Sequence, residues 1–157
     1  MQQDYSYQDL EKTISQIKQE MPGVIFCGAI PAQYIPKGEI NPKTGLPFTT
    51  QELEAMELDF SKKNVNISPE EWKKIKEFYQ QGHVGGHFPD LTNPDVQELL
   101  VDWAKKQIDC GADAIWIDGF FAAPSALMKL GKIESNHPFV EESLEAASKV
   151  VDEIHKY

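Results

Sequence analysis

The stretch from Asp90 to Asp118 constrains the fold more than any other part of this chain. Asn93 followed by Pro94 is typical of a helix start, because asparagine caps free N–H groups and proline fits the first helical turn. Gly111 is typical of the residue just past a helix end. Between them, apolar residues recur at helical spacing, namely Val96, Leu99, Leu100, Trp103 and Ile108. The sequence therefore predicts one amphipathic helix that leads into an apolar strand over residues 113–118.

Two other segments are expected to be strands. The continuous apolar run 24–30 predicts a strand buried on both faces. Residues 84–88 predict a weaker strand, because two glycines reduce its order. Strands separated by helices favour parallel βαβ units, which place their chemistry at the C-terminal strand ends. We expect an α/β protein in which residues 1–157 form a single domain with about three strands and flanking helices.

Helices are expected at both ends of the chain. An amphipathic pattern predicts a helix over about 6–20, which Pro22-Gly23 stops. A short helix over 125–130 precedes a last helix that begins at Pro138. The expected buried face of this last helix consists of Val140, Leu144, Ala147, Val151 and Ile154.

A long insertion is expected between the first two strands, at about 31–82. It contains a short helix near 51–57 capped by Thr50, and a second helix that Ser68 caps and Gly82 ends. An insertion of this length is usually functional, and a lid or wall over the strand ends is one such role.

Composition excludes several classes of partner. The net charge is −10, so the chain lacks the basic surface that binds nucleic acid, and an anionic membrane would repel it. No export signal or apolar run long enough to span a bilayer is visible, so we expect a cytoplasmic protein. Cys27, in a strand expected to be buried, and Cys110 are interpreted as reduced packing thiols, because two cysteines at this spacing form neither a metal motif nor a disulfide framework.

Three consecutive segments resemble a known enzyme family. They are Asp90–Val96, Trp103–Asp109 and Gly111–Asp118, and together they resemble the glycoside hydrolase (β/α)8 barrels of the α-galactosidase and α-glucosidase type. The resemblance implies a partial TIM barrel, in which residues 22–157 hold strands two to four and the helix after strand four. It also implies that the strand ending at Asp118 carries the catalytic nucleophile and that a later strand supplies the acid/base.

Asp118 is the candidate catalytic residue. Alternation along its strand puts Ala114, Trp116 and Asp118 on one side. A carboxylate there would act as nucleophile, or would support an oxocarbenium-like sugar centre. The candidate substrate-binding residues are His87, Asp90, Trp116 and Phe120.

Each of these residues also has a structural interpretation. Asp118 could cap the following loop, Asp90 and Thr92 could tie down a turn by side-chain hydrogen bonds, and Trp116 could belong to the core. Phe120 and its neighbour Phe121 could line a site or contact further chain.

No cofactor or metal is expected. His83, His87, Asp90 and Asp118 match no standard ligand spacing. The glycines at 82, 85 and 86 lack the residues of a phosphate loop. No lysine lies at a strand end, which counts against Schiff-base chemistry of the aldolase type.

Two functions therefore remain open. The first is a portion of a glycoside hydrolase that acts on O-glycosidic bonds. The second is a non-catalytic module that binds carbohydrate, or that associates with itself through open sheet edges. The expected partners are a carbohydrate and either a second copy or the remainder of a larger barrel.

Overall fold

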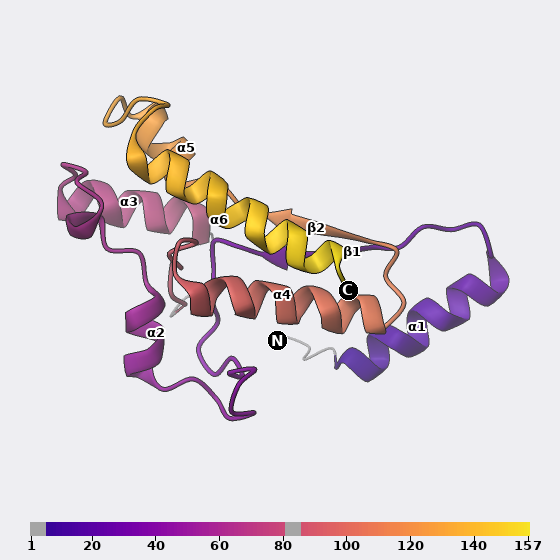
Figure 1. Ribbon diagram of the computed structural model, residues 1–157. Coiled ribbons are helices and arrows are strands. Elements are labelled where there is room, and N and C mark those ends of the chain that lie inside the picture. The colour runs from indigo at the N-terminus through magenta and orange to yellow at the C-terminus, as the bar shows by residue number, and fades with distance from the viewer. Residues whose placement is uncertain (1–5, 81–85) are drawn as a thin grey trace.

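The computed structural model describes residues 6–80 and 86–157, and within these ranges it contains one two-stranded parallel sheet (Figure 1). The strands are β1 (Cys27–Pro31) and β2 (Ala114–Asp118). The helices are α1 (Tyr7–Glu20), α2 (Thr50–Met56), α3 (Pro69–Gln80), α4 (Pro94–Asp109), α5 (Ala122–Lys129) and α6 (Pro138–His155), with a 3-10 turn η1 (Phe60–Lys62). The expected α/β class is confirmed.

Most helix starts follow the expected local chemistry. Asn93 accepts a hydrogen bond from the N–H of Asp95, and Pro94 opens α4 as predicted. Gly111 has a φ of 99°, which suits the position after this helix. The cap of α2 is one residue earlier than expected, because Thr49 and Glu52 form a reciprocal capping box.

The two strands and two long helices form the centre of the structure. β1 and β2 pair directly, with Ala29 opposite Trp116 and Pro31 opposite Asp118. Helices α4 and α6 lie side by side and cover one face of this sheet (Figure 1). β1, α4 and β2 therefore form a parallel βαβ unit, with α2 and α3 inserted between β1 and α4.

The expected third parallel strand does not form in residues 86–88. His87 makes an isolated antiparallel bridge with Ile35, and Pro89 makes another with Glu57. Val84 and Gly85, also predicted as strand, lie outside the described residues. Phe88 is buried at 2% exposure and packs edge-on against Trp72, so this segment follows the inserted region rather than the sheet.

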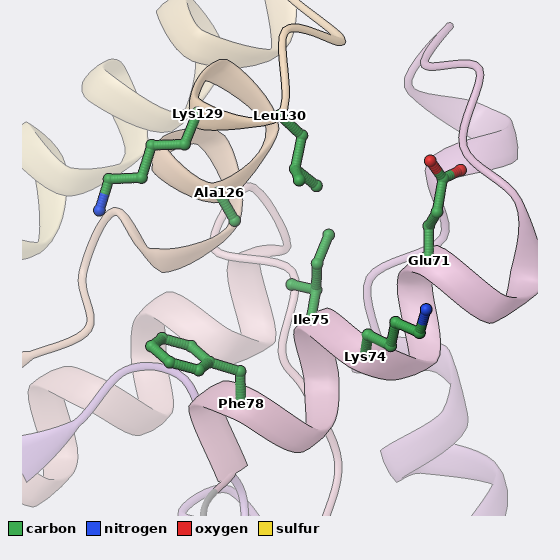
Figure 2. A pocket seen from close by; sticks show the side chains of 7 residues that line it. All are labelled: Glu71, Lys74, Ile75, Phe78, Ala126, Lys129 and Leu130. Carbon is green, nitrogen blue, oxygen red and sulfur yellow. The ribbon is translucent and has the colours of Figure 1, made fainter.

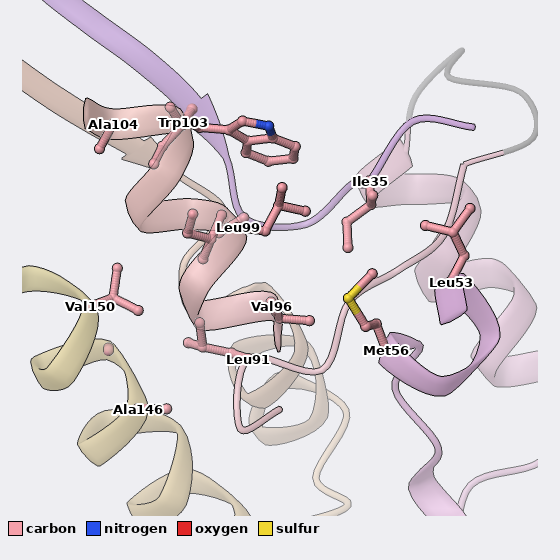
Figure 3. Packing of buried hydrophobic residues seen from close by; sticks show 14 of the residues in the cluster. Ile35, Leu53, Met56, Leu91, Val96, Leu99, Trp103, Ala104, Ala146 and Val150 are labelled. Atoms are coloured by element: carbon pink, nitrogen blue, oxygen red, sulfur yellow. The ribbon is translucent and has the colours of Figure 1, made fainter. Parts of the chain in front are cut away.

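The main hydrophobic cluster surrounds α4 (Figure 3). Leu99, Leu100 and Ala104 of this helix are almost completely buried. They contact β1 and α6, and the cluster also includes residues of the 31–82 segment, namely Ile35, Phe48, Leu53 and Met56. This segment therefore forms part of the core, although an insertion over the strand ends was expected.

A second cluster joins α3, α5 and the start of α6. Phe60 packs edge-on against Trp72 at a ring-centroid distance of 4.5 Å and against Phe139 at 6.1 Å. Ile75 and Leu127 are buried in the same cluster. The aromatic contacts fix the inserted segment beside the C-terminal half of the chain.

The expected burial of the first strand, of Cys27 and of Leu144 is wrong. The first strand is not buried on both faces, because helices cover only one of them, and Cys27 is exposed. This strand also begins at Cys27 rather than Val24. Leu144 was expected in the buried face of α6 but is 51% exposed, because that face passes through Ser143 and Ala147.

Candidate functional site

One face of the two-stranded sheet is open. The side chains that alternate onto it are Cys27, Ala29, Pro31, Ala114, Trp116 and Asp118. Ile30, on the opposite face, is only 2% exposed and packs beneath α4 and α6. The predicted alternation of Ala114, Trp116 and Asp118 on one side of β2 is confirmed by their exposure.

Asp118 lies at the C-terminal end of β2, where the neighbouring strand also ends. Its main-chain oxygen accepts a hydrogen bond of 2.7 Å from the N–H of Ala32. Its Oδ2 accepts a hydrogen bond of 3.0 Å from Nε2 of Gln33. The carboxylate is therefore oriented by the first residues after β1 while it stays exposed to solvent.

Gly119 allows this arrangement. It has a φ of 67°, and a Cβ placed there would lie 2.2 Å from Oε1 of Gln33. A larger residue would therefore displace the amide that orients Asp118. The Oε1 atom is buried and accepts no hydrogen bond within the described residues.

Trp116 lies two residues before Asp118 on the same face and is 63% exposed. The opposite residue on β1 is Ala29, and Ala114 and Cys27 are also small. The indole ring therefore stands above small neighbours, with no large side chain of the sheet beside it. A flat aromatic ring next to a carboxylate can stack on one face of a sugar, and the carboxylate can accept hydrogen bonds from its hydroxyls.

Asp90 forms hydrogen bonds and an ion pair within the protein. Its Oδ1 accepts from the N–H and Oγ1 of Thr92, at 3.0 and 2.7 Å. Its Oδ2 lies 3.0 Å from Nζ of Lys63, and the two side chains are only 16% and 13% exposed. These contacts match the structural interpretation, in which Asp90 fixes the turn before α4.

Phe120 and Asp90 line the same cavity, which has a volume of about 20 Å³. Such a space is close to the minimum for one water molecule and is far too small for a sugar. Phe120 also packs against the main hydrophobic cluster, whereas Phe121 is 38% exposed. The structure therefore brings Phe120 near the end of β2 but turns it toward the interior.

His87 belongs to a different polar cluster. Its Nδ1 lies 3.1 Å from Oε2 of Glu57, and Oε1 of Glu57 contacts Nζ of Lys76. Lys76 also lies over the ring of Trp72, 5.6 Å from its centroid. These partners join His87 to α3 rather than to the end of β2.

The open-face site therefore consists of Trp116, Asp118 and Gln33. Gln33 was not predicted. One signal was available, because Gln33 follows the first strand and the C-terminal ends of parallel strands meet at the same edge of a sheet. Lys63 had no such signal, since its contact with Asp90 depends on how the inserted segment packs.

The described residues do not form a metal or membrane site. Within 6–80 and 86–157, no three His, Cys, Asp or Glu side chains gather as metal ligands. His83, weighed as part of a metal set, lies outside these ranges. None of the helices there is long and apolar enough to cross a bilayer.

A separate groove of about 420 Å³ lies between α3 and α5 (Figure 2). Its apolar lining is Ile75, Phe78, Ala126 and Leu130. Lys74 and Lys129 border it, and Glu71 beside it pairs with Lys132 at 3.0 Å. None of the predicted site residues lines this groove.

Comparisons with known proteins do not assign the chain to a family. No family model matches the sequence, and no curated protein or solved structure matches it significantly. Its function is therefore inferred from the chain's own residues.

Proposed function

We propose that the open sheet face contacts a carbohydrate and that the chain is a portion of a glycoside hydrolase of the (β/α)8-barrel type. The observation that carries this proposal is the exposed indole of Trp116 beside Asp118 on one open face. The βαβ unit, with a carboxylate at the end of its second strand, is consistent with part of such a barrel.

The roles of the three side chains follow from their positions. Trp116 stacks on the apolar face of a sugar ring. Asp118 acts at the anomeric centre, as nucleophile or as the charge that stabilises an oxocarbenium-like transition state. Gln33 holds Oδ2 of Asp118, so Oδ1 is the oxygen that faces the sugar.

Complete hydrolysis needs a second carboxyl group. In retaining enzymes it lies about 5 Å from the nucleophile. Within residues 6–80 and 86–157, no acidic side chain shares a hydrogen-bond partner with Asp118. We therefore assign binding and charge stabilisation to Trp116 and Asp118, and we leave proton donation to the later barrel strand that the resemblance implies. Binding without turnover is the second candidate function, and the same observation favours it.

Binding is tested by titrating the protein with α-galactosides and α-glucosides and following tryptophan fluorescence. Trp103 is 6% exposed and Trp72 is partly buried against the second cluster, whereas Trp116 is 63% exposed, so the response should come from Trp116. Because Trp116→Ala also removes the fluorescent reporter, binding by the variants is measured by isothermal titration calorimetry. Trp116→Ala should abolish binding, and Asp118→Asn should weaken it. Leu144→Ala, which alters an exposed apolar residue of α6, serves as the control and should bind normally. Equal binding by Trp116→Ala, or none by the unmodified chain, would overturn the proposal.

Turnover separates the two candidates. Aryl glycosides are incubated with the unmodified chain and with Asp118→Asn. Release of the aryl group that is lost in Asp118→Asn favours the hydrolase, and binding without release favours the non-catalytic module. Release that the substitution leaves unchanged contradicts the nucleophile role.

A further inference from the structure

The groove between α3 and α5 shares no residue with the proposed carbohydrate site (Figure 2). Its floor is formed by Ile75 and Ala126, which are 7% and 8% exposed. Its walls are Phe78 and Leu130, which are 63% and 51% exposed. The volume of about 420 Å³ lies within the range of small-molecule pockets, which typically combine an apolar lining with a few charged groups.

The α5 side of this groove carries an uncompensated positive charge. From Gly119 to Ile133 the sequence contains no acidic residue, although the whole chain has 25. Lys129 lies at the groove within this stretch, is exposed, and forms no ion pair with any residue that the structure describes. Lys132, the other lysine of the stretch, pairs with Glu71 at 3.0 Å. In a protein with a net charge of −10, Lys129 therefore provides a local site that attracts an anion.

The α3 side of the groove has balanced charge. Lys74 lies at the groove, but the exposed Glu70 lies one helical turn before it and offsets its charge. Glu77, on the next turn, pairs with Lys73 at 3.8 Å. Figure 2 shows Lys74 and Lys129 on opposite sides of the apolar floor. We therefore expect the anionic group of a ligand at Lys129 and its apolar body across the floor.

We propose that this groove binds an aliphatic monocarboxylate, the anion of a fatty acid. Its carboxylate accepts hydrogen bonds from Nζ of Lys129, and its chain lies over Ile75 and Ala126 between the two exposed walls. Each methylene group buried there contributes affinity, and the ammonium group favours an anion over a neutral or cationic amphiphile. This proposal does not depend on carbohydrate binding, because the groove contains neither Trp116 nor Asp118.

The charges around the groove favour a small anion over an acidic protein. A protein segment with several carboxylates would meet one uncompensated lysine at this groove, and it would also face Glu70 and the net charge of −10. A second copy of the chain carries the same net charge and is repelled for the same reason. A single carboxylate with an apolar body needs only the ammonium group of Lys129.

Isothermal titration calorimetry with decanoate, kept below its micelle-forming concentration, tests the charged end of the site. The full chain should bind one decanoate with a dissociation constant below about 1 mM. Lys129→Gln should raise this constant by about tenfold, because a hydrogen bond from a charged donor is lost. Lys74→Gln should raise it by less than about threefold, since Glu70 already offsets that charge. Lys12→Gln, the same change at an exposed lysine of α1, is the control and should leave it unchanged.

Phe78→Ala tests the apolar part of the site. Loss of this exposed wall should raise the dissociation constant of decanoate by about fivefold. Leu144→Ala, at an exposed apolar residue of α6, is the matched control and should bind normally. Both side chains are more than half exposed, so both variants should unfold at nearly the temperature of the unmodified chain. Thermal unfolding therefore separates lost binding from lost folding.

Ligands of the same chain length test the selectivity of the groove. Decanol and decyltrimethylammonium should bind at least about tenfold more weakly than decanoate. Absence of decanoate binding, equal binding of the cation, or equal losses in Lys129→Gln and Lys12→Gln would overturn the proposal. Two other occupants would also overturn it. One is a second copy, seen in sedimentation as a dimer that Phe78→Ala dissociates. The other is an acidic protein segment, seen as a synthetic leucine- and glutamate-rich helix that binds through Lys129 when decanoate does not.

Discussion

Gln33 donates a hydrogen bond of 3.0 Å from Nε2 to Oδ2 of Asp118, and this contact joins the ends of the two strands. The carboxylate is exposed, so its orientation depends on this amide rather than on burial. Gly119 leaves the space in which the Gln33 side chain lies. The candidate site therefore depends on a glycine that does not itself contact a ligand.

Gly119→Ala should destabilise the protein and also disturb the site. A Cβ at this position would lie 2.2 Å from Oε1 of Gln33, and the φ of 67° is unfavourable for alanine. We expect a loss of about 2 kcal/mol or more in the free energy of unfolding, measured by urea denaturation.

Gly45→Ala is the matched control for this substitution. Gly45 has a φ of 69°, but a Cβ at this position would meet no other atom within 4 Å. Backbone strain alone should then cost about 1 kcal/mol. Equal losses in the two variants would show that Gln33 moves aside without cost.

Asp90→Ala should destabilise the protein because it leaves the largely buried Lys63 without its nearest carboxylate, which lies 3.0 Å away. The two side chains are 16% and 13% exposed. In the variant Lys63 would keep a hydrogen bond of 2.6 Å to Oγ1 of Thr92, and Glu142 at 3.8 Å would be its only remaining charged partner among the described residues. The expected loss is about 2–3 kcal/mol, below that of a fully buried pair. Lys43→Ala, which removes an ion pair to Asp95 with both side chains more than half exposed, should cost less than about 1 kcal/mol. Thermal unfolding of both variants measures the difference.

The two cysteines should differ in their reaction with a thiol reagent. Cys27 is exposed on the open sheet face. Cys110 is 7% exposed, and burial raises the pKa of its thiol, so less of the reactive thiolate is present. One thiol per native chain should react quickly, and the second should react only after unfolding. Cys27→Ser should remove the fast phase, and a fast phase that persists in this variant would contradict the assignment.

Acid should weaken the start of α3. The N–H of Ser68 and the nearby Lys132 lower the pKa of Glu71 from 4.5 to about 2. Because the pKa of Glu71 is lowered in the folded state, its ionised carboxylate stabilises the folded protein above pH 4.5. This contribution is lost as the pH falls toward 2. Glu71→Gln should therefore have a lower free energy of unfolding than the unmodified chain at neutral pH. The difference between the two free energies should shrink as the pH falls from 4.5 toward 2.

Glu70→Gln in the same helical turn is the control for the acid experiment. Urea denaturation at a series of pH values compares the two variants. A difference for Glu71→Gln that stays the same from neutral to acid pH would show that the charge of Glu71 does not contribute.

The elements that the sequence predicted best depend on local contacts. The helix from Pro94, its asparagine cap and the glycine after it all follow from residues within one or two turns of one another. The strand that ends at Asp118 and its alternation are local in the same sense. The shared, exposed side of the strand on which Trp116 and Asp118 lie was therefore predicted correctly, since both residues belong to one strand.

Near neighbours in the chain are enough to specify most helix starts, the second strand and the side of it that carries Trp116 and Asp118. Burial of the first strand could not be derived from its apolar run, because it depends on which face of the sheet the helices cover. Long-range packing also placed Gln33 beside Asp118 and Lys63 beside Asp90, and it drew residues 86–88 toward the inserted segment rather than the sheet. Each of these outcomes depends on contacts between residues far apart in the chain, and a local pattern does not encode them.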